Sequence, residues 1–183
     1  MTIASDFPEA IHLVKKYENF PRAGVNYYDL TPLLRDALFF GRTMERVARQ
    51  YSKKRIDYIV APESRGYMFG AALANKLGVG FVPAARYGSL PGKTISVQCP
   101  GGYHHEVDAI KELTLRVDDL PKGANVLVVD DILGTGHTSA ACKELAEKLG
   151  CVVVGAAFIL EIANLKGRSR LSSVEEVFSL MQI

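Results

Sequence analysis

The sequence predicts a single α/β domain with a mostly parallel central sheet. Three observations support this fold class. Strand-like and helix-like segments alternate along the chain. Apolar runs such as "VLVV" at residues 126–129 are typical of strands that helices cover on both faces. The length of 183 residues suffices for one compact domain with a sizeable core, and is short for two.

The N-terminal part of the chain is expected to be mainly helical. A short helix is predicted near residues 8–17, followed by an irregular segment at 19–29 and a helix over about 36–51. The alternating strands and helices then follow, and they are expected at 56–61 (strand), 67–77 (helix), 80–85 (strand), 125–130 (strand), 138–149 (helix) and 152–160 (strand).

Two further segments differ from this pattern. Residues 112–117 alternate apolar and polar side chains, which predicts a half-exposed antiparallel strand. Residues 87–108 have no clear periodicity and are rich in glycine and proline, so a long functional or mobile loop is expected there. The last part, from Asn164 on, is predicted to form a short helix and a final strand.

Composition excludes several classes of function. With 22 basic and 20 acidic side chains the formal charge is only +2, so no nucleic-acid partner is expected. The longest apolar run, 152–160, is too short to span a membrane, and Asp6 and Glu9 argue against a signal peptide, which favours a cytoplasmic location. The three cysteines are an odd number and include no CxxC pair, so we expect reduced, mostly buried thiols, with neither a disulfide framework nor a cysteine zinc site. No residue of the chain is expected to be a metal ligand.

Two adjacent carboxylates end the strand that contains "VLVV". Asp130 and Asp131 are followed by a turn of glycines and hydroxyl side chains that leads into the next helix. Such a turn exposes backbone N–H groups at a helix N-terminus and can hold a phosphate. Acidic residues that can bind hydroxyl groups, next to a turn that can bind a phosphate, fit a ribose 5-phosphate. The spacing of the turn fits neither a P-loop nor a dinucleotide fingerprint. A tight turn whose acidic pair caps the helix, or is simply solvated, is the alternative.

The stretch "VLVVDDILGTGHTS" resembles the signature of the type I phosphoribosyltransferase family. The similarity to the adenine-specific members extends to "YIVAPESRGYMFGAALANKLGVGFVP", "LPGKT", "FPRAGVNYYDLTPLLRD" and "LEIANLKGRSRLSSVEEVFSL". The resemblance implies the type I phosphoribosyltransferase fold over residues 1–183, with an N-terminal hood at 1–35 and a mobile lid at 87–108. It also implies a homodimer that binds 5-phosphoribosyl 1-pyrophosphate (PRPP), a purine base and Mg²⁺ carried mainly by PRPP.

The family's binding residues map onto three groups of positions in this chain. The pyrophosphate would be bound by Ser64, Arg65, Gly66, Arg86 and Lys93. The ribose hydroxyls and the 5-phosphate would be bound by Asp130, Asp131, Gly134, Thr135, Gly136, His137 and Thr138. The base would contact Val25, Asn26, Tyr27 and Tyr28.

The resemblance also implies the chemistry, in which a purine N9 replaces pyrophosphate at the anomeric carbon. Arg65 and Mg²⁺ would stabilise the negative charge of the leaving group. Asp130 and Asp131 would suit the positive charge that develops on the ribose. Glu106 is the nearest counterpart of the family's glutamate, a candidate proton donor or organiser near the base.

Gly134 favours adenine as the base, because many 6-oxopurine enzymes of the family have an aspartate at this position. Another purine base, hypoxanthine, guanine or xanthine, is the alternative substrate. A regulator that senses PRPP without catalysis is a further alternative. The sequence departs from the family pattern at Asn26, Tyr28 and Ala85, and in residues 101–108. His104 and His105 there could take a proton-transfer role or be solvated loop residues.

Overall fold

A computed structural model of the chain describes residues 7–100 and 112–183. It contains a seven-stranded sheet in the order β5-β6-β4-β3-β7-β8-β9. The members are β3 (Tyr58–Pro62), β4 (Gly80–Arg86), β5 (Thr94–Gln98), β6 (Glu112–Arg116), β7 (Asn125–Leu133), β8 (Val152–Glu161) and β9 (Val177–Gln182). The five strands β4, β3, β7, β8 and β9 are parallel to one another, while β6 pairs antiparallel with β4 and β5. The expected mostly parallel sheet is therefore confirmed.

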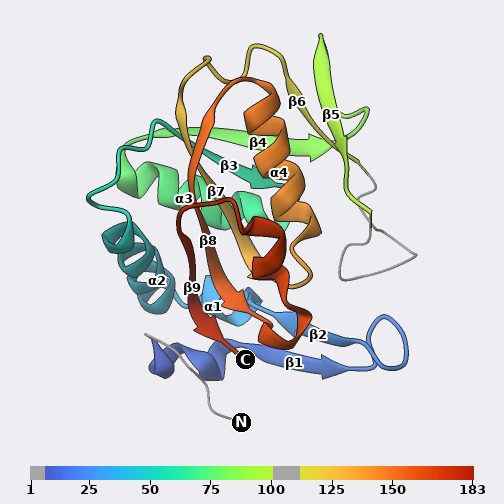
Figure 1. Ribbon diagram of the computed structural model, residues 1–183. Coiled ribbons are helices and arrows are strands. Elements are labelled where there is room, and N and C mark those ends of the chain that lie inside the picture. Colours follow the sequence, from blue (N-terminus) through green and yellow to red (C-terminus); the bar gives the residue numbers. More distant parts are fainter. Residues whose placement is uncertain (1–6, 101–111) are drawn as a thin grey trace.

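Helices cover both faces of this sheet (Figure 1). One face carries α4 (His137–Lys148), whose buried residues Ala141, Cys142 and Leu145 pack on one core cluster. The other face carries α2 (Ala37–Gln50) and α3 (Arg65–Leu77), which pack on a second core cluster. The shorter α1 (Thr31–Arg35) contributes Leu33 to this second cluster. Strand residues such as Val128 and Val129 belong to opposite clusters, as expected for a strand buried on both faces.

The helices begin and end where local chemistry requires. Asp36 precedes α2 and its carboxylate accepts a hydrogen bond from Phe39 N at 3.0 Å, which satisfies an otherwise unpaired helix-end donor. Helix α3 ends at Gly78, whose φ of 71° places it in the left-handed region that glycine adopts most easily. The predicted helices at 36–51, 67–77 and 138–149 are confirmed.

The N-terminal prediction is partly wrong. Residues Pro8–Leu13 form a 3₁₀ helix (η1), but the chain then forms β1 (Lys15–Glu18), which pairs antiparallel with β2 (Asn26–Asp29). This hairpin lies beneath the sheet in Figure 1. All four β1 side chains are exposed, so the strand has no alternation between a buried and an exposed face that a sequence pattern could reveal.

Two other expectations need correction. Residues 112–116 do form an antiparallel strand, β6, but it is not half-exposed. Leu113 and Leu115 belong to the core cluster that α4 packs on, and Thr114 on the other face is buried as well, with its hydroxyl donating to the Ile95 carbonyl. The segment 87–108 is not a continuous loop, since it contains β5. The part of the expected lid at 101–108 lies outside the described residues.

The C-terminal part forms two short 3₁₀ helices, η2 (Ala163–Leu165) and η3 (Gly167–Leu171), and then β9. The expected short helix and final strand are thus present. Cys99, Cys142 and Cys151 are free and buried, as predicted. Within the ranges 7–100 and 112–183, no helix has the length and apolar character needed to cross a bilayer.

Candidate active site

The predicted phosphate-binding turns lie next to each other at one edge of the sheet. Strands β3 and β7 are parallel neighbours, with Val60 opposite Val128, so their carboxyl ends meet at the same edge. From this edge the chain leaves β3 toward β4 on one side and leaves β7 toward β8 on the other. Ligands in open α/β sheets bind at such a reversal of strand order. Below, the β3–α3 turn denotes residues 63–66 and the β7–α4 turn denotes residues 134–138.

The β7–α4 turn is held by close backbone packing. Gly136 has a φ of 79°, and a Cβ atom there would lie 2.5 Å from the carbonyl oxygen of Gly167. Gly167 is similarly confined, because a Cβ on it would collide with the carbonyl oxygen of Gly134. Arg170 Nε also donates a hydrogen bond to the Thr135 carbonyl at 3.1 Å. Helix η3 therefore supports this turn from behind, and the α4 N-terminus begins directly after it.

Side chains of the same turn are also ordered by local contacts. The Thr135 hydroxyl lies 2.9 Å from His137 Nδ1, and both side chains are half-buried. Thr138 Oγ1 lies 3.8 Å from the thiol of Cys99, which follows β5. The turn thus combines backbone N–H groups at a helix N-terminus with two hydroxyls, which is a set of donors suited to a phosphate.

The two predicted ribose-binding carboxylates are buried at the end of β7. Asp130 and Asp131 are 8% and 4% exposed. Asp130 Oδ1 accepts a hydrogen bond from Asp131 N, and Asp131 Oδ1 accepts one from Ile132 N, both at 2.8 Å. Burial, together with the charge of Asp131, raises the pKa of Asp130 well above its usual range. A Cβ on Gly66 would lie 3.0 Å from Asp130 Oδ1, so this glycine lets the β3–α3 turn approach the acidic pair.

Arg65 connects the two turns. Its Nε lies 2.7 Å from Asp131 Oδ2, an ion pair that lacks hydrogen-bond alignment, so this oxygen has no hydrogen-bond partner within the described residues. Its Nη1 donates a hydrogen bond to the Tyr27 hydroxyl at 2.6 Å. Burial lowers the pKa of Arg65, but the charge of Asp131 and the contact with Tyr27 outweigh it, and the pKa is raised overall. Arg65 is therefore a fixed cation at the centre of the site.

The predicted base-binding residues lie on and before β2. Tyr27 faces Arg65, whose guanidinium carbon is 5.3 Å from the ring centroid. Tyr28 packs against the second core cluster instead, because successive side chains of a strand point to opposite faces. Val25 and Asn26 are half-buried beside them. Of this group, Tyr27 is the one that the described contacts join to the rest of the site.

Of the remaining predicted pyrophosphate residues, Ser64 lies in the β3–α3 turn and Arg86 contacts it, whereas no described contact joins Lys93 to it. Ser64 is exposed at the N-cap of α3, and its side chain makes no capping hydrogen bond. Arg86, at the end of β4, binds Glu63 through both its backbone N–H (3.0 Å) and its Nε (3.2 Å). Lys93 is exposed just before β5, and its ammonium forms no ion pair with the side chains described. Glu106, His104 and His105 lie outside the described residues.

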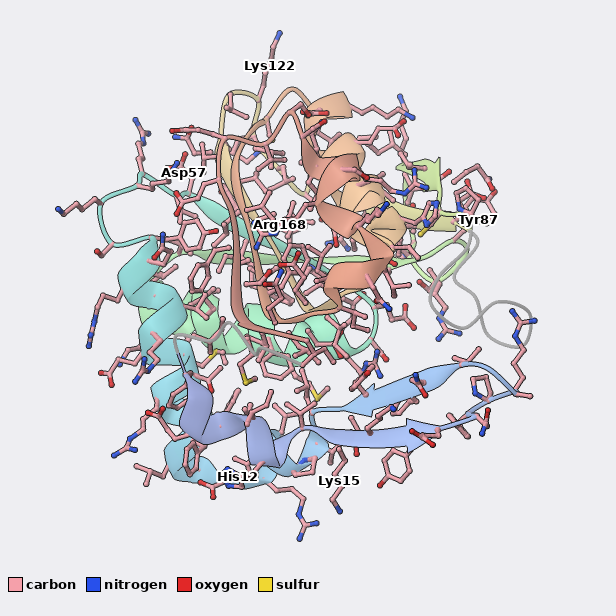
Figure 2. The ribbon with its side chains drawn as sticks, turned by 60° about the horizontal axis from the view of Figure 1, so that its bottom comes forward. His12, Lys15, Asp57, Tyr87, Lys122 and Arg168 are labelled. Atoms are coloured by element: carbon pink, nitrogen blue, oxygen red, sulfur yellow. The ribbon has the colours of Figure 1, made fainter. Side chains whose placement is uncertain are left out.

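Sequence reasoning missed the residues that support the site from behind. Glu161, which is 4% exposed at the end of β8, binds Arg168 through contacts of 2.7–2.9 Å. Arg168 also donates to the Val177 carbonyl at 2.6 Å and so joins η3 to β9. Figure 2 shows Arg168 near the middle of the molecule. The basic stretch "LKGRSR" was the available signal, but its residue types alone do not show which acidic side chain Arg168 pairs with.

Across residues 7–100 and 112–183, no three His, Cys, Asp or Glu side chains come close enough together to hold a metal ion. The only adjacent carboxylates of the site are Asp130 and Asp131 among the residues described. The described residues therefore offer at most a partial set of oxygen ligands to a cation here.

Comparison with known proteins identifies the family. A family model described as the phosphoribosyl transferase domain matches residues 36–180. The chain belongs to this family. An adenine phosphoribosyltransferase of Clostridium botulinum is 40% identical over 169 residues, which cover 92% of this chain and 95% of that protein. The resemblance to phosphoribosyltransferases inferred from the motifs is confirmed.

Solved structures agree with this family assignment. The adenine phosphoribosyltransferase of Thermoanaerobacter pseudethanolicus superposes with a TM-score of 0.86 at 35% identity, over 96% of this chain and 98% of that one. The Saccharomyces cerevisiae enzyme superposes with a TM-score of 0.84 at 35% identity, over 94% and 96% of the two chains. That structure holds an imino-altritol 1,6-bisphosphate together with adenine. The predicted type I phosphoribosyltransferase fold is confirmed.

Proposed function

We propose that this phosphoribosyltransferase converts adenine and PRPP to AMP and pyrophosphate, a reaction of purine salvage. The observation that carries the proposal is the pair of adjacent strand-to-helix turns with the Asp130–Asp131 pair between them. PRPP has the same layout, since its 5-phosphate and its pyrophosphate lie at opposite sides of a ribose that carries two hydroxyls.

Each part of PRPP has a matching group in the site. The β7–α4 turn supplies backbone donors and the hydroxyls of Thr135 and Thr138 for the 5-phosphate. The β3–α3 turn supplies Ser64, Arg65 and Gly66 for the pyrophosphate, Arg86 is joined to this turn through Glu63, and Lys93 is a further candidate. Asp131 Oδ2, which lacks a hydrogen-bond partner in the part of the chain described, is an acceptor for a ribose hydroxyl.

The reaction forms a bond between purine N9 and the anomeric carbon and breaks the bond from that carbon to the pyrophosphate oxygen. The N9 proton passes to a general base or to water, and the electron pair of the broken bond remains on pyrophosphate. Arg65 stabilises the charge that collects on the leaving group, while Asp130 and Asp131 stabilise the positive charge of the ribose. Because these groups are fixed before the substrate arrives, little reorganisation is required during the reaction.

The acidic pair is compatible with Mg²⁺ that arrives on the substrate. Asp130 and Asp131 would contact the ion through water or through the ribose hydroxyls, because the described residues provide no complete set of ligands. The ion would neutralise charge on the pyrophosphate as it departs.

Adenine is favoured for two reasons. Gly134 provides no carboxylate near the base, unlike many 6-oxopurine enzymes. The relatives at 35–40% identity are named adenine phosphoribosyltransferases, and the yeast structure holds adenine. Residues Val25, Asn26, Tyr27 and Tyr28 form the candidate base-binding segment, and Glu106 is the candidate organiser of the base.

The wider arrangement also remains a proposal: one domain over 1–183, a hood at 1–35, a lid at 87–108, a homodimer and a cytoplasmic location. The lid would exclude water, which could otherwise hydrolyse the activated sugar.

Turnover with a panel of bases tests the function. The purified chain is mixed with PRPP, Mg²⁺ and adenine, hypoxanthine, guanine or xanthine, and the nucleotide formed is measured. AMP formation at a kcat/KM at least about 100-fold above the other bases is expected, a ratio of the size that a few polar contacts give. Preference for another purine would support the proposed reaction and show that adenine is not the substrate. Failure with every base, together with PRPP binding, would favour the non-catalytic regulator.

A further inference from the structure

The hairpin that carries the candidate base-binding residues contacts the pyrophosphate side of the site through one hydroxyl. Tyr27 accepts a 2.6 Å hydrogen bond from Arg65 Nη1, although the two residues are 38 positions apart in the chain. Arg65 Nε is meanwhile paired with Asp131 on β7. The guanidinium is thus held at two points, from β2 and from β7.

We propose that the Tyr27 hydroxyl positions Arg65 for the pyrophosphate end of PRPP, in addition to any contact of the Tyr27 ring with the base. This inference rests on the proposed function and deepens it. Tyr27 acts through Arg65, so it is a positioning residue for PRPP binding, and its hydroxyl and its ring have separate roles.

Geometry explains why two anchors matter. Guanidinium N–H groups form a rigid planar fork, so fixing Nε and Nη1 also fixes the direction of the remaining donors. With the Asp131 contact alone, the plane could rotate about that contact. Arg65 is half-buried. Without the Tyr27 contact, its side chain would lose conformational freedom only when the ligand binds. The Tyr27 hydroxyl therefore lowers the entropic cost of binding pyrophosphate.

Neighbouring aromatic residues hold Tyr27 itself in place. Phe20 packs edge-on against its ring with centroids 5.5 Å apart, and Tyr17 lies opposite it in the hairpin with centroids 6.4 Å apart. These contacts involve the ring and not the hydroxyl. Replacing Tyr27 by phenylalanine should therefore keep the hairpin and the base-facing ring while removing the hydrogen bond to Arg65.

The test compares Tyr27→Phe with Tyr17→Phe. Tyr17 is the matched control because it is the cross-strand partner, is exposed, and loses the same hydroxyl. Calorimetry measures the dissociation constants of PRPP with Mg²⁺, of pyrophosphate with Mg²⁺, and of adenine. In Tyr27→Phe both phosphate ligands should bind about tenfold more weakly, as expected for a hydrogen bond to a charged group, while adenine changes less than about twofold.

Tyr17→Phe should leave all three constants unchanged, and both variants should keep the melting temperature of the wild type. Equal weakening of adenine and PRPP in Tyr27→Phe would indicate a displaced hairpin and overturn the proposal. PRPP binding within about twofold of the wild type would overturn it as well, since the expected hydrogen bond would then be energetically absent.

A double-mutant cycle shows whether the hydroxyl acts through Arg65. In an Arg65→Lys background the effect of Tyr27→Phe on pyrophosphate binding should fall below about twofold, because an ammonium cannot keep both contacts in the planar geometry. Additive effects would overturn the positioning role. Pyrophosphate binding needs no turnover, so a wild-type chain that fails with every base would contradict the proposed function separately from this inference.

Discussion

The two strand-to-helix turns of the site occupy equivalent places but are stabilised in different ways. The β7–α4 turn is fixed by its backbone, through the close approach of Gly134 and Gly136 to Gly167 and the hydrogen bond from Arg170 to the Thr135 carbonyl. The β3–α3 turn exposes Ser64, and its functional group is one long side chain, Arg65, fixed by partners on β2 and β7.

Under the proposed function, this difference predicts a division of labour, in which each turn binds a different end of PRPP. A rigid backbone cradle suits the 5-phosphate, which does not change during the reaction. A side-chain cation suits the pyrophosphate, which gains charge as it leaves and must then depart from the site. Substitutions that affect one turn and spare the other test the comparison, and we expect the following effects in decreasing order.

Asp131→Asn removes the ion pair that joins Arg65 to the β7 side of the site. We expect kcat to fall by about 10³-fold, the upper part of the range for losing one preorganised electrostatic contact, while the fold is kept. Steady-state kinetics and a melting curve measure both effects. Asp118→Asn, the same change at an exposed turn position, is the control. Turnover near the wild-type level in Asp131→Asn would contradict the ribose-binding role.

Gly136→Ala tests the backbone cradle. The added Cβ would lie 2.5 Å from the Gly167 carbonyl, so the turn must shift, and a shift of this kind costs about 10²-fold in kcat/KM. Gly123→Ala is a matched control, because Gly123 has a similar φ of 82° but no atom within 4 Å of the added Cβ. Its neighbour Lys122 lies at the end of the molecule away from the β1–β2 hairpin (Figure 2).

The control should lose about 1–2 kcal/mol of stability from its left-handed backbone and retain its activity. If both alanine variants lost activity equally, backbone strain alone would explain the result, and the close packing of Gly136 on Gly167 would be unimportant.

Arg168→Met tests how much the ion pair between Glu161 and Arg168 contributes to the free energy of unfolding. It leaves Glu161 buried without its counter-charge, and we expect the free energy of unfolding to fall by about 3 kcal/mol at pH 7. Lys148→Met, which breaks the exposed pair with Glu144 at 3.0 Å, should change it by less than about 0.5 kcal/mol. Denaturant titration measures both.

The same pair predicts a pH dependence. Burial favours a raised pKa for Glu161, but the hydrogen bonds and charge of Arg168 outweigh it and lower the pKa below its ordinary value of 4.5. The stabilisation is therefore present above pH 4.5 and is lost as the pH falls through the lowered pKa. In Arg168→Met burial dominates and raises the pKa of Glu161. The difference in the free energy of unfolding between the wild type and the variant should therefore become smaller as the pH falls from 7 to 4.5. An equal difference at both pH values would show that Glu161 is not the group responsible.

The smallest expected effect concerns the thiols. Burial raises the pKa of Cys99, Cys142 and Cys151, so a thiol reagent should modify all three slowly until the chain unfolds. Because Cys99 contacts Thr138, ribose 5-phosphate should slow its modification a few-fold further, and pyrophosphate should not. Mass spectrometry of each site reports the rates, with Cys151, which contacts the Pro121 carbonyl, as the internal control. Equal protection by both ligands would argue against separate phosphate sites.

Much of this architecture could be predicted from the sequence because its signals are local. The apolar run before Asp130, the glycines of the β7–α4 turn and the apolar spacing of α2, α3 and α4 each predicted their own structure. The hairpin β1–β2 escaped prediction because its exposed strands follow no burial pattern. Strand β5 was missed because it lies in a segment rich in glycine and proline, where its pairing with β6 decides the structure.

The contacts that orient the site could not be predicted in the same way. Arg65 and Tyr27 were both named as candidates, but their hydrogen bond joins segments that meet only in the folded chain. The packing of Gly167 on the β7–α4 turn likewise depends on η3 returning to the edge of β7. Residue type and spacing predict which groups bind a ligand, whereas long-range packing decides how those groups are held.

The division of labour between the two turns is tested most directly by calorimetry of ribose 5-phosphate and of pyrophosphate with Mg²⁺, each with Gly136→Ala and with Arg65→Lys. We predict a crossover: Gly136→Ala weakens ribose 5-phosphate at least about tenfold and leaves pyrophosphate within about twofold, and Arg65→Lys does the reverse. If each substitution weakened both ligands equally, the two turns would not bind separate ends of one substrate, and the account would be contradicted.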